Sequence, residues 1–187
     1  MLSGGPLEGD YNILQFHFHW GSTNYQGSEH TVNGQEYPLE LHIVHTKDGE
    51  DDPLNTPKGL AVTGFFFKLT NRDNPALTPL TDALQEVLDP DSELDFANSD
   101  FKIDELIGDI APINGAVTPY SHYEGSLTTP TCNEVVEWIN FLTPIPISDN
   151  QLDMFRALMD SHGKNIVNNY RPPQPLNGRP VEFYGPP

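Results

Sequence analysis

The segment QFHFHWG, residues 15–21, constrains the fold of this chain more than any other stretch of its sequence. From residue 13 to residue 20 the chain alternates strictly, with Leu14, Phe16, Phe18 and Trp20 on one face and Ile13, Gln15, His17 and His19 on the other. A period of two is typical of a β-strand. The segment therefore predicts a strand that presents two imidazoles on the same face.

His17 and His19 are close enough in such a strand to bind one ion, because same-face neighbours lie about 6 to 7 Å apart. A second alternating stretch, residues 38–45, puts Glu40, His42 and Val44 on a common face, so His42 is the best candidate for a third ligand. Three neutral imidazoles suit Zn²⁺ and leave its fourth tetrahedral position open, as in catalytic rather than structural zinc sites.

The alternative interpretation is a strand whose histidines are hydrogen-bonded parts of the core, since this spacing also occurs without a metal. Gln15 and Glu40 favour the metal site. Each precedes a proposed ligand by two residues on the same face, where it could accept a hydrogen bond from the second ring nitrogen. The residue pattern alone leaves both interpretations open.

Two further segments predict strands, and together the four segments indicate a mainly β fold. Residues 59–69 are almost entirely apolar, which predicts burial on both faces of a sheet, and residues 134–142 are the other strand. Acidic loops are expected at residues 48–58 and 89–100. The 18 prolines and 15 glycines agree with short elements joined by long loops.

Two helices are expected beside the strands. Thr78 followed by Pro79 predicts an N-cap with proline at the first helical position, and helical spacing of apolar residues continues to Leu88. Ser148 and Gln151 form a capping-box pattern before a helix that runs to Met159, and Gly163 is placed to stop it.

Composition excludes several classes of protein. The 187 residues, 36% of them hydrophobic, predict one domain over residues 1–187 with a real core. A net charge of −18 repels phosphate backbones and anionic lipid, which argues against nucleic acid as a partner. No apolar run approaches the roughly 20 residues of a membrane span, and the first residues lack a signal-peptide pattern. The single cysteine, Cys132, cannot form a disulfide within this sequence.

Several motifs, in order and at matching spacing, resemble those of one enzyme family. They are QFHFHWG (15–21), SEHTV (28–32), ELH (40–42), GSLTTP (125–130), EVVEW (134–138) and NYRP (169–172). Together they cover essentially the whole chain, and they closely resemble the α-class carbonic anhydrases. The resemblance implies a large, twisted, mostly antiparallel sheet with a few peripheral helices.

The resemblance also implies a set of metal ligands and the groups that orient them. His17, His19 and His42 match the family's zinc ligands. Gln15 would orient His17, Glu40 would orient His42, and the backbone carbonyl of Asn169 would hold His19. His30 and Tyr123 match structural hydrogen-bonding partners.

The remaining implied roles concern the substrate. Thr128 would accept a hydrogen bond from zinc hydroxide and donate its own to Glu29, because a carboxylate can only accept. Thr129 would contact bicarbonate. The apolar wall that holds CO₂ would comprise Val44, Val62, Leu127, Val136 and Trp138, although for any one of the aliphatic residues taken alone, packing in the core is the better explanation.

The implied activity is reversible hydration of CO₂ to bicarbonate and a proton by zinc-bound hydroxide, with sensitivity to sulfonamide inhibitors. Zinc lowers the pKa of its bound water, and carbonic anhydrase is itself the standard example of that effect. Two alternatives are a non-catalytic binding or matrix protein related to carbonic anhydrase, whose activity truncation would abolish, and a purely structural zinc module. The open fourth zinc position argues against the structural module.

The sequence also departs from the family pattern. The resemblance begins at Gly4, so the expected domain is N-terminally truncated and lacks the family's proton-relaying histidine. Ser121 replaces a family tryptophan and Glu124 a proline, both expected in a loop near the site. Cys132 matches a disulfide position of secreted members, which leads us to expect an extracellular protein in preference to a cytoplasmic one.

Overall fold

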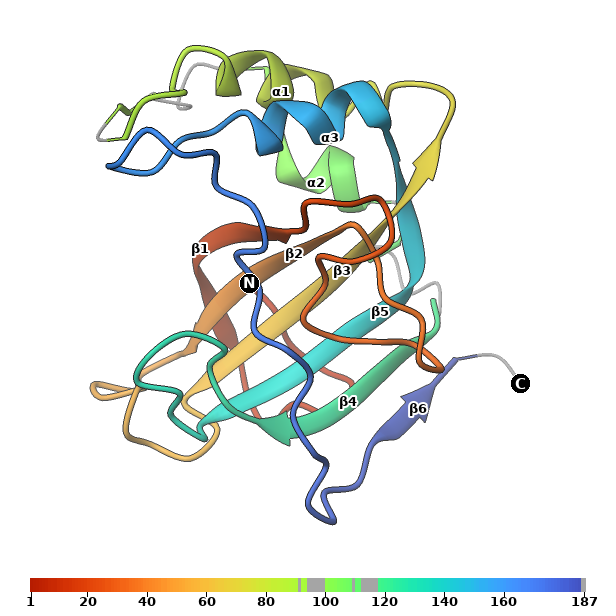
Figure 1. Ribbon diagram of the computed structural model, residues 1–187. Coiled ribbons are helices and arrows are strands. Elements are labelled where there is room, and N and C mark those ends of the chain that lie inside the picture. Colours follow the sequence, from red (N-terminus) through yellow and green to blue (C-terminus); the bar gives the residue numbers. More distant parts are fainter. Residues whose placement is uncertain (91, 94–99, 109, 112–117, 186–187) are drawn as a thin grey trace.

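Six strands form one sheet in the computed structural model, which describes residues 1–90, 92–93, 100–108, 110–111 and 118–185. They are β1 (Tyr11–Trp20), β2 (Leu39–Lys47), β3 (Leu60–Thr70), β4 (Tyr120–Gly125), β5 (Val136–Ser148) and β6 (Glu182–Tyr184). Their order across the sheet is β1-β2-β3-β5-β4-β6, and all neighbours are antiparallel except β3 and β5 (Figure 1). The predicted mainly β fold with a mostly antiparallel sheet is confirmed.

The four strands predicted from the sequence are β1, β2, β3 and β5. β3 is buried from Leu60 to Phe67, as its apolar composition predicts. β4 and β6 were not predicted, since YSHYEG mixes polar and aromatic residues on both faces and β6 has three residues. Ser121 and Glu124 lie within β4, so the expectation that they belong to a loop is wrong.

Helices α1 (Thr78–Leu84), α2 (Ile103–Ile107) and α3 (Asp149–Arg156) gather at one end of the sheet (Figure 1). The predicted capping box at Ser148 is present and begins α3. The residue that caps α1 is Leu77 rather than Thr78, because the Thr78 hydroxyl instead donates to the Asn74 carbonyl.

Both helices end earlier than predicted. α1 stops at Leu84, four residues before Leu88. α3 stops at Arg156 because Met159 pairs with Asn165 in a short β-bridge and donates its backbone N–H to Leu88. Residues 48–58 form the predicted loop, whereas most of the second predicted acidic loop, 89–100, lies outside the described residues.

The two faces of the sheet have different partners. On one face, Leu41 and Ile43 of β2 belong to a large apolar cluster that includes residues of all three described helices. On the other face, His42 and Val44 point toward the long β1–β2 connection, residues 21–38, and a second cluster built around Trp138. This second face holds the candidate site.

β1 forms one edge of the sheet, and its first half is poorly covered. The side chains of Ile13, Leu14 and Phe16 are 53%, 62% and 38% exposed. A shift in register between Ile13 and Gln15 interrupts the pairing with β2 here. Within the described residues, none of the helices has the length and apolar character that crossing a membrane requires.

Candidate metal centre and active site

The three histidines predicted as metal ligands converge on one face of the β1–β2 pair. His17 lies directly opposite His42 in the antiparallel register, and His19 lies opposite Glu40. The ring centroids are 4.9 Å apart for His17 and His19, 5.3 Å for His17 and His42, and 4.7 Å for His19 and His42. One ring nitrogen from each lies within 4.8 Å of those of the other two, so the group could hold a metal ion.

Each of these rings has its other nitrogen bonded to a fixed acceptor. His17 Nδ1 lies 2.8 Å from Gln15 Oε1, and His19 Nδ1 lies 2.8 Å from the backbone oxygen of Asn169. His42 Nε2 lies 2.6 Å from Glu40 Oε1. An imidazole that donates from one nitrogen offers a lone pair on the other, so these contacts set which nitrogen faces the centre.

Glu40 connects this centre to the loop above it. Its side chain is fully buried and contacts four donors: the backbone N–H groups of Glu29 and His30, and the rings of His30 and His42. Burial alone would raise the pKa of Glu40, but the two imidazoles and their hydrogen bonds hold it well below its usual range. The carboxylate therefore stays ionised and acts only as an acceptor.

A second possible metal group, His30, Glu40 and His42, overlaps the first. Its nitrogens are already used, because His30 Nδ1 and His42 Nε2 both contact Glu40 Oε1 at 2.6 Å. His30 Nε2 lies 2.6 Å from the Tyr123 hydroxyl, which completes a hydrogen-bonded chain from His42 to β4. The hydrogen bonds within this second group therefore hold His42, a member of the first group, in place.

The electrostatics of the first group keep the imidazoles of His17 and His19 neutral. Burial, followed by the proximity of His42 and His19, lowers the pKa of His17 to about 3. Burial and His42 likewise lower the pKa of His19. Uncharged imidazole is the form that binds a metal.

Glu29 reaches the centre from the β1–β2 connection. Its Oε1 accepts the backbone N–H of Arg171 at 2.7 Å, while Oε2 lies 3.3 Å from His19 Nε2 and 3.8 Å from His42 Nδ1. His19 Nε2 and Glu29 Oε2 are both buried without a hydrogen-bond partner among the described residues. Buried polar atoms are rarely left unpaired, so each of these two atoms is available to a further partner.

A glycine brings this connection back over the sheet. The backbone at Gly27 has a φ of +151°, and a Cβ there would lie 2.2 Å from the Pro38 oxygen and 2.5 Å from the Gly21 nitrogen. Only glycine permits this close approach of two backbones. It precedes Glu29 by two residues and so helps to position that carboxylate.

Thr128 lines the same cavity as Glu29, but the described residues contain no hydrogen bond between them. Thr129 is exposed in the following turn, where its carbonyl accepts the Cys132 N–H. The five residues predicted as an apolar wall belong to one cluster on the histidine face: Val44, Val62, Val136 and Trp138 are buried, and Leu127 is half-buried against them.

Two features of this site were not predicted from the residues. Glu40 receives hydrogen bonds from the loop as well as from His42, and the backbone of Arg171 holds Glu29. The Arg171 contact joins residues 142 positions apart, and in both features a backbone donor has no side-chain signature. The NYRP motif marks the region, although not the contact.

Comparison with known proteins agrees with this geometry. A family model described as eukaryotic-type carbonic anhydrase matches residues 1–185. The chain is 42% identical over 190 residues to human carbonic anhydrase 7, covering 97% of this chain and 68% of that protein. It is 38% identical to mouse carbonic anhydrase 3 over 97% of this chain and 68% of the relative, and 38% identical to a putative carbonic anhydrase 5 of Caenorhabditis elegans over 98% and 57%.

These relatives correct the expected location of the protein. The similarity to carbonic anhydrases 7 and 3 points away from secretion, so the extracellular expectation based on Cys132 is wrong. Cys132 is a free thiol in the described structure and occupies a turn with a φ of +59°. The expectation required a disulfide partner outside this sequence, and a cysteine position alone does not supply one.

The motifs, the sheet and the relatives agree on the enzyme class that the sequence predicted. The family match covers nearly the whole chain, and it includes the strands that bring the three histidines together. The chain belongs to the eukaryotic-type carbonic anhydrase family.

Proposed function

We propose that this protein catalyses the reversible hydration of CO₂ to bicarbonate and a proton at a zinc centre held by His17, His19 and His42. One observation carries the proposal: the three imidazoles meet on one sheet face, and each has its outward nitrogen fixed by an acceptor. A hydrogen-bonded core would not require three inward nitrogens to face one another.

The residues fit a zinc ion. The donors are three neutral nitrogens, which suit Zn²⁺, and three protein ligands leave room for a water or substrate. The unpaired, buried His19 Nε2 supports the fit, since an ion would give that atom its missing partner. When bound, zinc supplies the Lewis acidity that makes water a nucleophile near neutral pH.

The chain itself would orient the reacting groups. Glu29 is held by the Arg171 N–H, and its carboxylate can only accept hydrogen bonds. We therefore assign Thr128 the role of donating to Glu29, which leaves the Thr128 oxygen to accept a hydrogen bond from the nucleophile. The Thr128 hydroxyl would donate to Glu29 and accept from the nucleophile, which directs a lone pair toward CO₂. The hydrogen bond between Thr128 and Glu29 is part of the proposal.

The apolar cluster beside the histidines suits CO₂, which has weak hydrogen-bonding demands. Val44, Val62 and Trp138 are buried there, with Val136 and Leu127 beside them. Bicarbonate makes stronger hydrogen bonds, so an apolar surface favours its release. Thr129, which is exposed in the turn after Thr128, is the residue that we expect to contact bicarbonate. Sulfonamide inhibitors are expected to bind at the same centre.

The test measures CO₂ hydration and zinc content of the same preparation. We expect the zinc-loaded protein to turn over and to be inhibited by an arylsulfonamide. His42→Ala should lose both zinc and activity, whereas His162→Ala, which alters an exposed histidine, should keep both. Stoichiometric zinc in His42→Ala would refute the ligand set, and a zinc-loaded but inactive wild type would favour a non-catalytic relative.

A further inference from the structure

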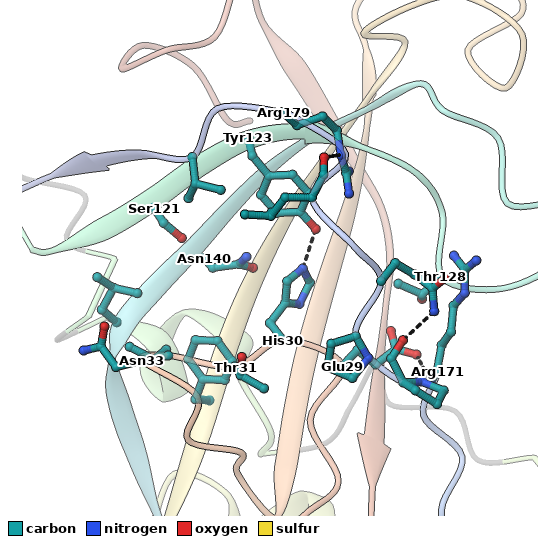
Figure 2. A pocket seen from close by; sticks show the side chains of 18 of the residues that line it. Glu29, His30, Thr31, Asn33, Ser121, Tyr123, Thr128, Asn140, Arg171 and Arg179 are labelled. Carbon is teal, nitrogen blue, oxygen red and sulfur yellow. Dashed lines mark hydrogen bonds between the residues drawn. The ribbon is translucent and has the colours of Figure 1, made fainter.

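A cavity of about 480 Å³ extends from the proposed active site into a region with no role in the reaction. Figure 2 shows Glu29, Thr128 and Arg171 at one end of it and Ser121 and Asn140 at the other, with His30 and Tyr123 between them. None of the three histidines proposed as metal ligands lines this cavity. The end near Ser121 is therefore separate from the metal centre.

The hollow near Ser121 is produced by a small residue between two larger ones. Ser121 on β4 pairs with Asn140 on β5 and with Phe183 on β6. Paired residues on neighbouring strands point to the same face of a sheet, so the three side chains lie abreast. Serine is too short to fill the space between its neighbours, and a wider side chain at this position would project into the cavity.

The floor of this hollow contains unsatisfied polar groups. Asn140 is only 3% exposed, and its Oδ1 has no hydrogen-bond partner among the described residues. Ser121 is 7% exposed, and within the same part of the chain its hydroxyl makes no hydrogen bond. Buried polar groups are nearly always paired. A buried, unpaired amide oxygen beside a hydroxyl that bonds to no described residue is matched by a ligand that carries a hydrogen-bond donor.

The other walls are apolar and partly aromatic: they include Val32, Phe66, Leu142, Val181 and Phe183. The volume lies toward the lower end of the range for small-molecule sites, about 300 to 1,000 Å³, which suits a molecule of one or two rings. Leu176 and Phe183 are 54% and 71% exposed at the rim, so a ligand can enter from solvent.

The charges nearby favour an uncharged ligand. Arg179 lines the cavity, but its guanidinium donates to the carbonyls of Glu124, Leu176 and Pro175 and lies 5.5 Å from the centre of the Tyr123 ring. Those contacts use one N–H of each guanidinium nitrogen. An anion near Ser121 would be desolvated beside the unpaired Asn140 oxygen, which is costly.

We propose that the Ser121 end of the cavity binds an uncharged, planar heteroaromatic molecule of one or two rings. The rings lie between Phe66, Tyr123 and Phe183, and a ring N–H donates to the Asn140 amide oxygen or the Ser121 hydroxyl. Occupancy needs neither metal nor turnover, so this binding site stands or falls independently of the proposed catalytic function.

Indole is a suitable probe, and the zinc-loaded full chain is titrated with it by calorimetry. Ser121→Trp fills the hollow and is expected to weaken binding by at least about tenfold. Ser161→Trp makes the same change at an exposed position, so we expect it to bind indole like the wild type. Backbone amide shifts of the wild type should change at Ser121 and Asn140, a result that does not depend on any variant folding.

The hydrogen bond is tested with 1-methylindole, which lacks the N–H. We expect it to bind the wild type between about three and ten times more weakly than indole, the range for one hydrogen bond. Asn140→Leu should reduce this discrimination. Absence of saturable indole binding by folded wild type, binding that Ser121→Trp leaves unchanged, or shifts confined to other residues would overturn the site. Equal affinities for the two probes would overturn the assigned donor.

Discussion

At the scale of single residues, Glu40 connects the proposed metal centre to the loop above it through four hydrogen bonds. Its Oε1 accepts hydrogen bonds from the rings of His42 and His30, and its Oε2 accepts the backbone N–H groups of Glu29 and His30 in the loop. A change here affects the proposed ligand His42 and the loop together.

Glu40→Gln tests this double role. The amide keeps one acceptor but points two N–H groups at donors, so we expect zinc affinity to fall by about 10- to 100-fold and unfolding free energy by about 1 to 3 kcal/mol. Competition with a chelator and denaturant unfolding measure the two effects. Glu36→Gln changes an exposed glutamate and should leave both unaltered; an unchanged zinc affinity in Glu40→Gln would contradict the role.

Thr128→Ala tests the orientation of the nucleophile. We expect turnover to fall by roughly a hundredfold while zinc content stays normal, because only hydrogen bonding to the reacting group is lost. CO₂ hydration and elemental analysis on one preparation measure both. Turnover equal to that of the wild type would mean that Glu29 acts without Thr128.

His17 makes acid stability a further test at this scale. Its pKa falls from the ordinary 6.5 to about 3 in the fold, so the unfolded chain binds more protons between these values. The zinc-free protein should therefore lose stability as pH falls from 6.5 toward 3. Glu40, whose pKa is also lowered, adds to the loss below its ordinary 4.5. In denaturant titrations across this window, His17→Gln should show a shallower decline; equal slopes would show that His17 is not responsible.

At the scale of elements, the sequence predicted regular structure where the local signals are strong. The alternation of β1 and the capping box of α3 are local and were recognised. The end of α3 was not, because a β-bridge between Met159 and Asn165 competes with further helix. β4 became recognisable as a strand only through its pairing with β5 and β6, which no short window of sequence contains.

In the candidate site, too, the features with a local sequence signal were predictable and those that depend on long-range contacts were not. Two histidines on one strand and a third on the next follow from a period of two, and the structure brings the three together. The carbonyl of Asn169, about a hundred and fifty residues from His19, and the hold of Arg171 on Glu29 depend on tertiary packing. Family resemblance suggested the first of these contacts, whereas residue patterns suggested neither.

The stability that the capping box contributes can be measured at the start of α3. Ser148 is buried, accepts the Gln151 N–H at 3.1 Å and bonds Asp73 through the same hydroxyl. Ser148→Ala should lower unfolding free energy by about 1 to 2 kcal/mol, the usual effect of losing an N-cap. Ser161→Ala is the exposed control. A loss no larger than the control's, measured by urea unfolding, would mean that Gln151 and Asn74 hold this helix start unaided.

The β1 edge makes a second prediction about an element. Unpaired backbone groups beside exposed apolar side chains invite pairing with another strand. Since Leu14 is 62% exposed on this edge, Leu14→Lys should reduce self-association with little change in stability. Sedimentation velocity over a concentration series measures this. Equal association of variant and wild type would place the contact elsewhere.

At the scale of the whole molecule, net charge opposes that association. A chain of charge −18 repels its copies at low ionic strength, where screening is weak. Added salt shortens the screening length from about 30 Å at 0.01 M to about 3 Å at 1 M. We therefore expect the wild type to associate more as sodium chloride is raised, and Leu14→Lys to respond less. Association that declines with salt would indicate an ionic interface instead.

The direct pairing of His17 with His42 has a consequence for the order of folding. All three imidazoles belong to β1 and β2, neighbours in sequence, whereas the centre of the sheet closes only when β3 meets β5 across more than sixty residues. Closing so long a loop is slow compared with pairing adjacent strands. If the three histidines bind zinc as proposed, we expect a two-stranded ribbon of β1 and β2 to bind it before the sheet is complete, so that zinc speeds refolding as well as slowing unfolding. Stopped-flow refolding with and without zinc, compared with His42→Ala, distinguishes such early capture from binding to the finished fold.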